Sequence, residues 1–555
     1  MIGVIANLEE EELVREFFEL FKTPWEWFRE EGSYEVVLMT GERPGARDLT
    51  ANLVVVYSGR QLTLDRDHGI PVGAHEHGGM LSHEGCELPI YGDLVTFQES
   101  AEGFLSEQQS RHSAGVLRRS GSHSLARIGY DLFRELKTLL STGQPTENAH
   151  VPTVEIHVAI LRNLMVEAGI AFVEIPPTPA GYAFVACLTH DVDHPSIRKH
   201  RFDHTMFGFI YRAVIGSILG VLRRRLPIHH LITNLVAVAK LPLVHLRLAE
   251  DYWLNFDRYL DIEKGLNSTF FVLPFRDAPG SAAGGMAPPK RASRYAAADL
   301  AVHLQRLVSA GREIGLHGID AWNNSSIGRK EREEVARITG AEEIGVRMHW
   351  LYYDGEAPVT LENAGFVYDS TVGYNETVGY RAGTAQVFKP LSATRLLELP
   401  LHIMDTALFY PSHLNLTFEQ ARHRVSALIK EMLKYGGVLT LNWHDRSIAP
   451  ERLWGEFYSD LVSDLRAKGA WCTSGGRVVR WFRKRRSIVF KQNAQFIEIA
   501  MPNASEASGD GLPELKVRRY NRRRTDLGSS CVFIDAAFTG TARISLSKDW
   551  SLACQ

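Results

Sequence analysis

From Gly181 onward, short apolar segments alternate with amphipathic helical segments, and this alternation limits the possible folds more than any other feature. An amphipathic stretch such as 296–310 is typical of the helices that separate buried strands. Buried strands alternating with helices indicate a parallel sheet or barrel. The sequence therefore predicts an α/β domain over residues 176–487, with buried strands at 183–189, 268–273, 313–317, 344–349 and 436–444.

Polar residues follow four of these strands. In a parallel α/β barrel the catalytic groups gather at the carboxyl ends of the strands. Any one of these residues alone is readily explained as structural, but four polar strand ends together favour one shared site. The strand ends are 189–194 (THDVDH), His317, 347–350 (RMHW) and 442–445 (NWHD).

The residue types at these ends suit a divalent metal ion and acid–base catalysis. Zinc takes His nitrogen and carboxylate oxygen as ligands and lowers the pKa of water. A second carboxylate can accept a proton, and a histidine can protonate a leaving amine. Asp191 and Asp193 are two residues apart, which places them on one face of an extended chain and suits a division into base and ligand. Arg347 can hold the base ionised.

At these residues the sequence resembles the polysaccharide deacetylases, carbohydrate esterase family four. The resemblance extends over residues 181–486 and is carried by ACLTHDVDH, EIGLHG, GVRMHW and LTLNWH. It implies a distorted (β/α) barrel that hydrolyses the N-acetyl group of an amino sugar with a divalent metal, zinc being favoured. It also implies roles for single residues: Asp191 as base, Asp193 and His317 as metal ligands, Arg347 as the contact of the base, and His444 as general acid.

One position departs from the pattern of the family. The family usually has a second ligand histidine four residues after the first, and Ala321 stands there in this chain. The candidates for the missing ligand are Asp320, His194 and His349. We favour His349 slightly, because it replaces a residue of the pocket wall that is usually proline in the family.

The resemblance also suggests which side chains contact the sugar. The segment 365–384 looks like a subgroup signature that brings Asp369 and Arg381 near the site. We expect substrate contacts from Trp350, Arg381 and Trp443. The substrate is then an amino-sugar glycan or a lipid-linked sugar, used in the synthesis of cell-surface polysaccharide. Two alternatives remain open: a carbohydrate-binding protein that has lost turnover, and a hydrolase of a C–N bond in a non-sugar substrate.

A basic, apolar insert at 205–248 separates the first two strands. It contains two apolar runs, and Arg223, Arg224 and Arg225 follow the first of them. An apolar helix with a basic end suits peripheral contact with a membrane of anionic lipid. The alternative is a helical hairpin packed on the barrel.

The flanking regions give weaker signals. Residues 1–175 indicate an N-terminal α+β domain of unknown role, which turns helical between Tyr130 and Gly169. His75, His77 and His83 lack ordered ligand spacing, so we interpret them as solvated loop histidines rather than a metal site. Residues 488–555 indicate a small β-rich C-terminal region, with a turn near 504–511.

Charge and cysteine usage bear on partners and location. The formal net charge is −3, and the basic residues near the C-terminus suit a solvated face, so we predict no nucleic-acid partner. The five cysteines form no CxxC pair, which fits a reducing compartment. The sequence begins MIGVIANLEEEE, without the basic and then apolar order of a signal peptide. We expect a cytoplasmic protein, located at the inner face of the membrane if the insert binds lipid.

Overall fold

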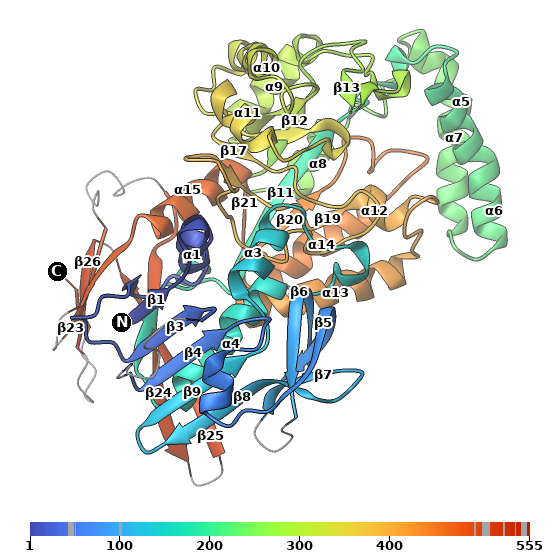
Figure 1. Ribbon diagram of the computed structural model, residues 1–555. Coiled ribbons are helices and arrows are strands. Elements are labelled where there is room, and N and C mark those ends of the chain that lie inside the picture. The colour runs from blue at the N-terminus through green and yellow to red at the C-terminus, as the bar shows by residue number, and fades with distance from the viewer. Residues whose placement is uncertain are drawn as a thin grey trace. The chain divides into compact units, whose positions relative to one another are not determined.

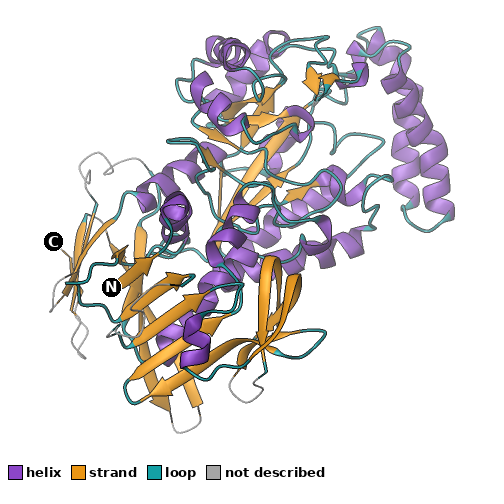
Figure 2. Cartoon of the chain, viewed as in Figure 1, coloured by secondary structure: helices purple, strands orange, loops and turns teal. Residues whose placement is uncertain are grey.

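The computed structural model describes residues 1–42, 49, 51–98, 103–282, 284–492, 496–501, 511–525, 528–538, 540–545 and 552–554. The chain forms two compact units (Figures 1 and 2). Unit 1 comprises residues 1–181, 380–391 and 480–555. Unit 2 comprises residues 182–379 and 392–479.

Unit 2 is built on a parallel sheet whose strands include the five predicted segments. Its central strand, β11 (Phe184–Val192), is buried at every position, as expected for a strand covered on both faces. The strand order is β18-β17-β16-β15-β12-β11-β20-β19. The other strands are β12 (Thr269–Val272), β15 (Glu313–Gly318), β16 (Val346–Met348), β17 (Tyr368–Asp369), β18 (Leu397–Glu398), β19 (Ile403–Met404), β20 (Val438–Asn442) and β21 (Ala470–Thr473).

The segment 397–404 closes this sheet, because its two ends form the two outermost strands. β18 pairs with β17, and Leu401 N then donates to Val372 O. His402 N donates to Thr440 O, after which β19 pairs with β20. The barrel is irregular at β11, where β21 pairs with residues 184–187 and β12 with residues 189–192. All strand ends used by the site therefore lie on one rim, as expected for a distorted α/β barrel.

Helices connect the strands of unit 2 as predicted for alternating strands and helices. The expected helix at 296–310 is present as a short 3₁₀ turn followed by α9. The helices are α8 (Phe256–Ile262), α9 (Ala301–Ser309), α10 (Ser325–Thr339), α11 (Ala357–Ala364), α12 (Asp405–Phe409), α13 (Phe418–Tyr435) and α14 (Gly455–Ala467).

The insert between β11 and β12 is a helical hairpin. Its first arm contains α5 (His204–Tyr211), a π-helical segment at 212–216 and α6 (Ser217–Leu222), and its second arm is α7 (Ile228–His245). The arms lie side by side in Figure 1. Their inner residues, including Phe209, Ala237 and Val244, pack around Trp253. The first arm, His204–Leu222, is long and apolar enough to span a membrane, with a mean hydropathy of 1.7, and only 28% of it is buried. One such helix is weak evidence for a span.

Unit 1 contains a mixed sheet with the strand order β2-β1-β3-β4-β9-β8-β6-β5-β7. Strands β2, β1, β3, β4 and β9 are parallel, and the remaining pairings are antiparallel. The predicted helical region forms α3 (Leu132–Leu140) and α4 (Thr153–Glu167), which follow α1 (Glu11–Leu20) and α2 (Thr63–Asp67). The strands are β1 (Ile2–Ile5), β2 (Trp25–Trp27), β3 (Val36–Thr40), β4 (Leu53–Tyr57), β5 (Val72–His83), β6 (Cys86–Phe97), β7 (Gly103–Glu107), β8 (Ser113–Ser120) and β9 (His123–Ile128).

The three histidines expected in a loop lie instead on strand β5. This strand forms a long hairpin with β6, in which His75 pairs with Val95 and His77 with Asp93. Cross-strand hydrogen bonds to β6 hold this glycine-rich segment extended. The loop interpretation of this region is therefore wrong. His83 is also not solvated, because it is buried with its Nδ1 3.1 Å from the carbonyl oxygen of Phe104.

The C-terminal region belongs to unit 1, whereas the sequence predicted three successive regions. β10 (Phe172–Glu174) pairs antiparallel with β24 (Leu515–Thr525), which joins the N-terminal and C-terminal segments of unit 1 in one sheet. α15 (Gly475–Arg486) leads from unit 2 into unit 1. The remaining strands are β22 (Val489–Gln492), β23 (Phe496–Ala500), β25 (Gly528–Phe538), β26 (Thr541–Ser545) and β27 (Leu552–Cys554). Most of the turn expected near 504–511 lies outside the described residues.

Candidate active site

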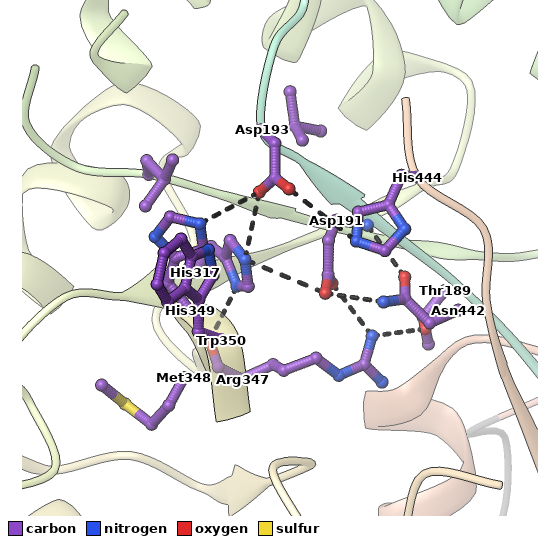
Figure 3. Close-up of polar contacts among 12 residues, drawn as sticks. Thr189, Asp191, Asp193, His317, Arg347, Met348, His349, Trp350, Asn442 and His444 are labelled. Carbon is purple, nitrogen blue, oxygen red and sulfur yellow. Dashed lines mark hydrogen bonds and ion pairs between the residues drawn. The ribbon is translucent and has the colours of Figure 1, made fainter. Parts of the chain in front are cut away.

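The carboxyl end of β11 presents Asp191 and Asp193 to one cavity of unit 2. The cavity has a volume of about 570 Å³ and is lined by Asp191, Asp193, His317, His349 and His444. These five residues come from four strand ends that are far apart in the sequence (Figure 3). His190 directly precedes Asp191 on β11. Its side chain points away from the cavity and forms a hydrogen bond with the buried Glu263. This alternation follows from the two-residue period of an extended chain.

Both oxygens of Asp191 are fixed by neighbouring side chains. Arg347 Nη1 donates to Oδ1 at 3.0 Å, and Asn442 Nδ2 donates to Oδ2 at 2.7 Å. Arg347 itself is fully buried and also donates to Thr189 Oγ1 and to Ser370. Burial raises the pKa of Asp191, but Arg347 and the nearby histidines outweigh burial and hold that pKa below its usual value. Asp191 is thus held as an oriented carboxylate.

Asp193, His317 and His349 form a compact group of possible metal ligands. Asp193 Oδ1 lies 3.4 Å from His317 Nε2 and 3.6 Å from His349 Nε2. The ligand atoms of all three residues lie within 4.8 Å of one another. Ligands about 2.0–2.1 Å from a tetrahedral zinc ion would be separated by about 3.4 Å. The spacing of the group therefore fits a small divalent ion.

The hydrogen bonds around this group leave its ligand atoms available. His317 Nδ1 lies 2.9 Å from the carbonyl oxygen of Arg347, a contact that places the proton on Nδ1 and leaves a lone pair on Nε2. Asp193 Oδ1 is buried and has no hydrogen-bond partner among the described residues. A buried carboxylate oxygen without a donor is costly unless something else satisfies it. Two imidazole nitrogens and one carboxylate facing one point fit a divalent cation.

His444 faces the same point and is paired with a buried carboxylate. Its Nδ1 lies 2.6 Å from Asp405 Oδ1, and its backbone N–H donates to Asp405 Oδ2 at 2.7 Å. Its Nε2 lies 3.8 Å from Asp193 Oδ2. Burial lowers the pKa of His444, but Asp405 and the two cavity carboxylates raise it to about 9. His444 therefore carries a proton on the nitrogen that faces the cavity.

Trp350 forms part of the cavity wall next to His349. The φ angle of Trp350 is 62°, which is unusual for a residue with a large side chain. Trp350 directly follows His349 of the ligand group in the sequence. Asn375 Nδ2 donates to the carbonyl oxygen of Trp350 at 3.1 Å. Lys290 Nζ lies 5.7 Å from the centre of the indole ring. The wall thus presents an aromatic face with a cation beside it.

Two of the expected substrate contacts are placed elsewhere. Trp443 is 0% exposed and stacks on Phe457 and Tyr458 of α14. Asn442 and His444 point to the site, so strand alternation turns Trp443, which lies between them, to the opposite face. Trp443 therefore cannot contact a sugar in the cavity. Arg381 belongs to unit 1, where its carbonyl oxygen accepts from Gln144 N at 2.7 Å, and it does not line the described wall of the cavity.

The other candidates for the third ligand are placed differently from His349. Asp320 Oδ1 accepts from Ser281 N at 2.6 Å, outside the ligand group. His194 lines the cavity but packs against His200, with ring centres 5.1 Å apart. Ala321 is buried, and a Cβ at Gly328 of α10 would lie 3.1 Å from it. Among the described residues, His349 is the candidate brought to Asp193 and His317.

Sequence reasoning missed Asp405, and it placed Asn442 at a strand end of the site without giving it a role. Asp405 begins the short helix α12 directly after β19, in a segment without a clear strand pattern. Asn442 precedes the conspicuous Trp443 and His444, and its position two residues before His444 was the available signal. Asp369 is buried on β17 beside Ser370, which accepts hydrogen bonds from Arg347.

No protein-family model and no curated protein matches the chain. Among solved structures, a polysaccharide deacetylase candidate from Mycobacterium smegmatis has a TM-score of 0.35 and 19% identity, covering 56% of this chain and 94% of that one. A deacetylase candidate from Pseudomonas aeruginosa PAO1 has a TM-score of 0.35 and 14% identity, covering 56% and 95%. The Puue allantoinase has a TM-score of 0.31 and 15% identity, covering 54% and 91%. Because these scores are low, the chemistry assigned below rests on the side chains of the cavity.

Proposed function

We propose that the protein is a metal-dependent hydrolase that removes the N-acetyl group from an amino sugar. The observation that carries this proposal is the meeting of three elements in one cavity: the fixed carboxylate of Asp191, the ligand group of Asp193, His317 and His349, and His444, which is paired with Asp405. Amide hydrolysis needs a base for water, an electrophile for the carbonyl and an acid for the amine. The substrate would be an amino-sugar glycan or a lipid-linked sugar.

Asp193, His317 and His349 would hold the divalent ion, for which zinc suits the ligand types. Such an ion supplies Lewis acidity, which lowers the pKa of water and polarises an amide carbonyl. Asp191 accepts the proton of the attacking water through a lone pair that its bonds to Arg347 and Asn442 leave free.

His444 delivers a proton to the departing amine. Its Nδ1 is held by Asp405, so Nε2 carries the proton that faces the cavity. Trp350 offers a flat apolar face on the cavity wall, which suits stacking on a sugar ring. With His349 in the ligand group, the lack of a histidine at Ala321 no longer favours a protein that only binds sugar.

The metal site is tested by measuring the divalent ion bound per chain in purified variants. Asp193→Asn and His349→Gln should lower the metal content, because each removes a ligand. Asp320→Asn and His194→Gln are matched controls from the same rim and should retain the wild-type content. Loss of metal in the control variants but not in the ligand variants would show that the proposed ligands are wrong.

The reaction is tested by measuring acetate release from N-acetylated amino sugars. Asp191→Asn should keep the bound metal and lose turnover by at least about 100-fold, since the amide cannot serve as the base. Wild-type activity in this variant would remove Asp191 from the base role. Acetate release only from non-sugar amides would retain the hydrolase chemistry and replace the sugar.

Peripheral contact with an anionic membrane through the hairpin is part of the proposal. Residues 204–248 contain six Lys or Arg and no Asp or Glu. At the base of the hairpin, a hollow of about 600 Å³ is lined by Arg198, Lys199, Arg201, Arg247 and Arg294. Basic residues beside exposed apolar side chains suit the surface of an anionic leaflet. We therefore place the protein in the cytoplasm, at the inner face of the membrane.

Liposome sedimentation with point variants tests this contact while preserving the packed inner face of the hairpin. Leu222 and Ile228 are 73% and 66% exposed, so their replacement by Asn leaves the core intact. The double variant should bind less to vesicles that contain phosphatidylglycerol. Val302→Asn, at a site on α9 that is 81% exposed, is the matched control and should bind like wild type. Equal binding by the double variant would refute the contact.

A further inference from the structure

A second cavity of unit 2 lies between the hairpin and the barrel. Its volume is about 410 Å³, which is within the usual range for small-ligand pockets. The hairpin contributes Gly216, Leu219 and Leu226, and the barrel side contributes Phe409, Pro411 and Trp454. We call it the hairpin cavity. Charged side chains line it too, among them Arg212 and Glu451, which form an ion pair at 3.0 Å. The apolar side chains on both sides suit a hydrocarbon chain.

The hairpin cavity adjoins the catalytic cavity. Tyr410 and Arg452 line both, and Arg452 Nη2 donates to the Tyr410 hydroxyl at 2.9 Å. These two side chains are thus shared between a polar cavity and a cavity that presents apolar side chains beside charged ones. A molecule that occupies both must have a polar head and an apolar tail.

The outer surface of the hairpin continues this apolar character. Large apolar side chains are exposed on both arms, among them Phe207, Ile215, Leu222, Ile232 and Leu235. Two arginines of the turn region, Arg223 and Arg225, line the hairpin cavity itself. Because of the exposed apolar side chains on both arms, a hydrocarbon chain leaving the bilayer would meet apolar surface before it reaches the cavity.

We infer that the substrate is an amphiphile, whose N-acylated head lies in the catalytic cavity and whose hydrocarbon chain lies in the hairpin cavity. The identity of the head rests on the proposed function, whereas the place of the chain rests on the two shared side chains and the apolar side chains of the lining. The occupant of the hairpin cavity is thus the chain of the substrate itself. This narrows the substrate class to an amino sugar carried on a lipid.

Gly216 offers a way to fill the hairpin cavity. Its backbone is helical, with φ of −58°, and a Cβ there would lie 3.8 Å from its nearest neighbour, Arg212 Cβ. A side chain is therefore tolerated by the backbone. Gly216→Phe should occupy the cavity, and Gly216→Ala is the matched control that adds a methyl group without filling it.

The test is calorimetric titration of the full-length protein with methyl and octyl N-acetylglucosaminide, the latter below its micelle concentration. Each buried methylene adds about fourfold to affinity, so burial of three or more should make the octyl glycoside at least about 50-fold tighter in wild type. Gly216→Phe should lose at least about tenfold of this gain, while Gly216→Ala keeps it within about twofold. Both variants should bind the methyl glycoside like wild type.

Equal affinity for the two glycosides in wild type would overturn the inference. If Gly216→Phe still bound the octyl glycoside as much more tightly than the methyl glycoside as wild type does, the inference would also be overturned, because the chain would then bind elsewhere. If circular dichroism shows that Gly216→Phe is unfolded, Leu219→Gln replaces it, since Leu219 lines the cavity and is already 39% exposed. An octyl gain without acetate release would refute the proposed reaction alone. Acetate release with equal affinities would refute the amphiphile alone.

Discussion

Glu155 allows a stability measurement whose size follows from the structure. This residue of α4 is buried, and its Oε1 accepts from Thr384 Oγ1 at 2.6 Å and from Ala385 N at 3.1 Å. It therefore anchors the segment 380–391 within unit 1. Its other oxygen, Oε2, is also buried and lies near Gln386. Burial raises the pKa of Glu155 from 4.5 to about 7.

The raised pKa makes unit 1 less stable as the pH rises. Because the folded state holds its proton more tightly than the unfolded state, the contribution is fully present below about pH 4.5 and is lost by about pH 7. At about 1.36 kcal/mol per pKa unit, this shift corresponds to about 3 kcal/mol, most of which falls between pH 5 and pH 8.

Glu155→Gln should remove this pH dependence. The amide keeps Oε1 for Thr384 and Ala385 and puts a neutral group in place of Oε2. Relative to wild type, the variant should gain about 2–3 kcal/mol in free energy of unfolding on going from pH 5 to pH 8. Urea unfolding of both proteins at both pH values measures the change. A difference between the proteins that is the same at pH 5 and pH 8 would refute the reasoning.

Three further substitutions test the site and its support. Trp443→Ala should lower the free energy of unfolding by about 3–5 kcal/mol in a urea titration, because it leaves a cavity against α14; a loss below about 1 kcal/mol would contradict the packing role. Arg347→Met should destabilise by about 3–5 kcal/mol, because it leaves the buried carboxylate of Asp191 without its cation; unchanged urea stability would show that the pair is dispensable. Asp405→Asn should lower kcat for acetate release by about 100-fold with unchanged metal content, because His444 loses its carboxylate partner, and an unchanged kcat would exclude this role.

The barrel strands could be predicted because their burial on both faces makes them short, continuous apolar runs. β12, β16 and β20 lie within the predicted segments, β15 extends one residue beyond its segment to Gly318, and β11 begins one residue late and extends to Val192. Parallel pairing then brings their carboxyl ends to one rim. For this reason, strand ends far apart in the sequence could be assigned to one site before any coordinates were known.

The placement of Trp443 could have been predicted and was not. Asn442 and His444 face Asp191 and Asp193, so strand alternation sends the side chain between them to the other face. Arg381 is a different case, because the return of residues 380–391 to unit 1 depends on contacts with Gln144 and Glu155 that no local pattern reveals.

Asp405 and the strand β5 show where local pattern is insufficient. Asp405 is assigned to the site by its contact with His444, 39 residues later in the chain. β5 is glycine-rich and mostly solvent-facing, so it lacks the apolar alternation of a half-buried strand. Its extended form depends on the hydrogen bonds of the partner strand β6. Both features require a partner that sequence periodicity does not identify.

The pairing of β10 with β24 has a consequence for the order in which the protein is made. Residue 174 is synthesised long before residue 515. β10 therefore has no pairing partner until the whole barrel and then β24 have been synthesised. Domains usually fold as they emerge, starting from the N-terminus. Here the second unit is complete at residue 479, while the first still lacks its last segments. The nascent chain must therefore keep an unfinished sheet edge soluble until β24 has been synthesised.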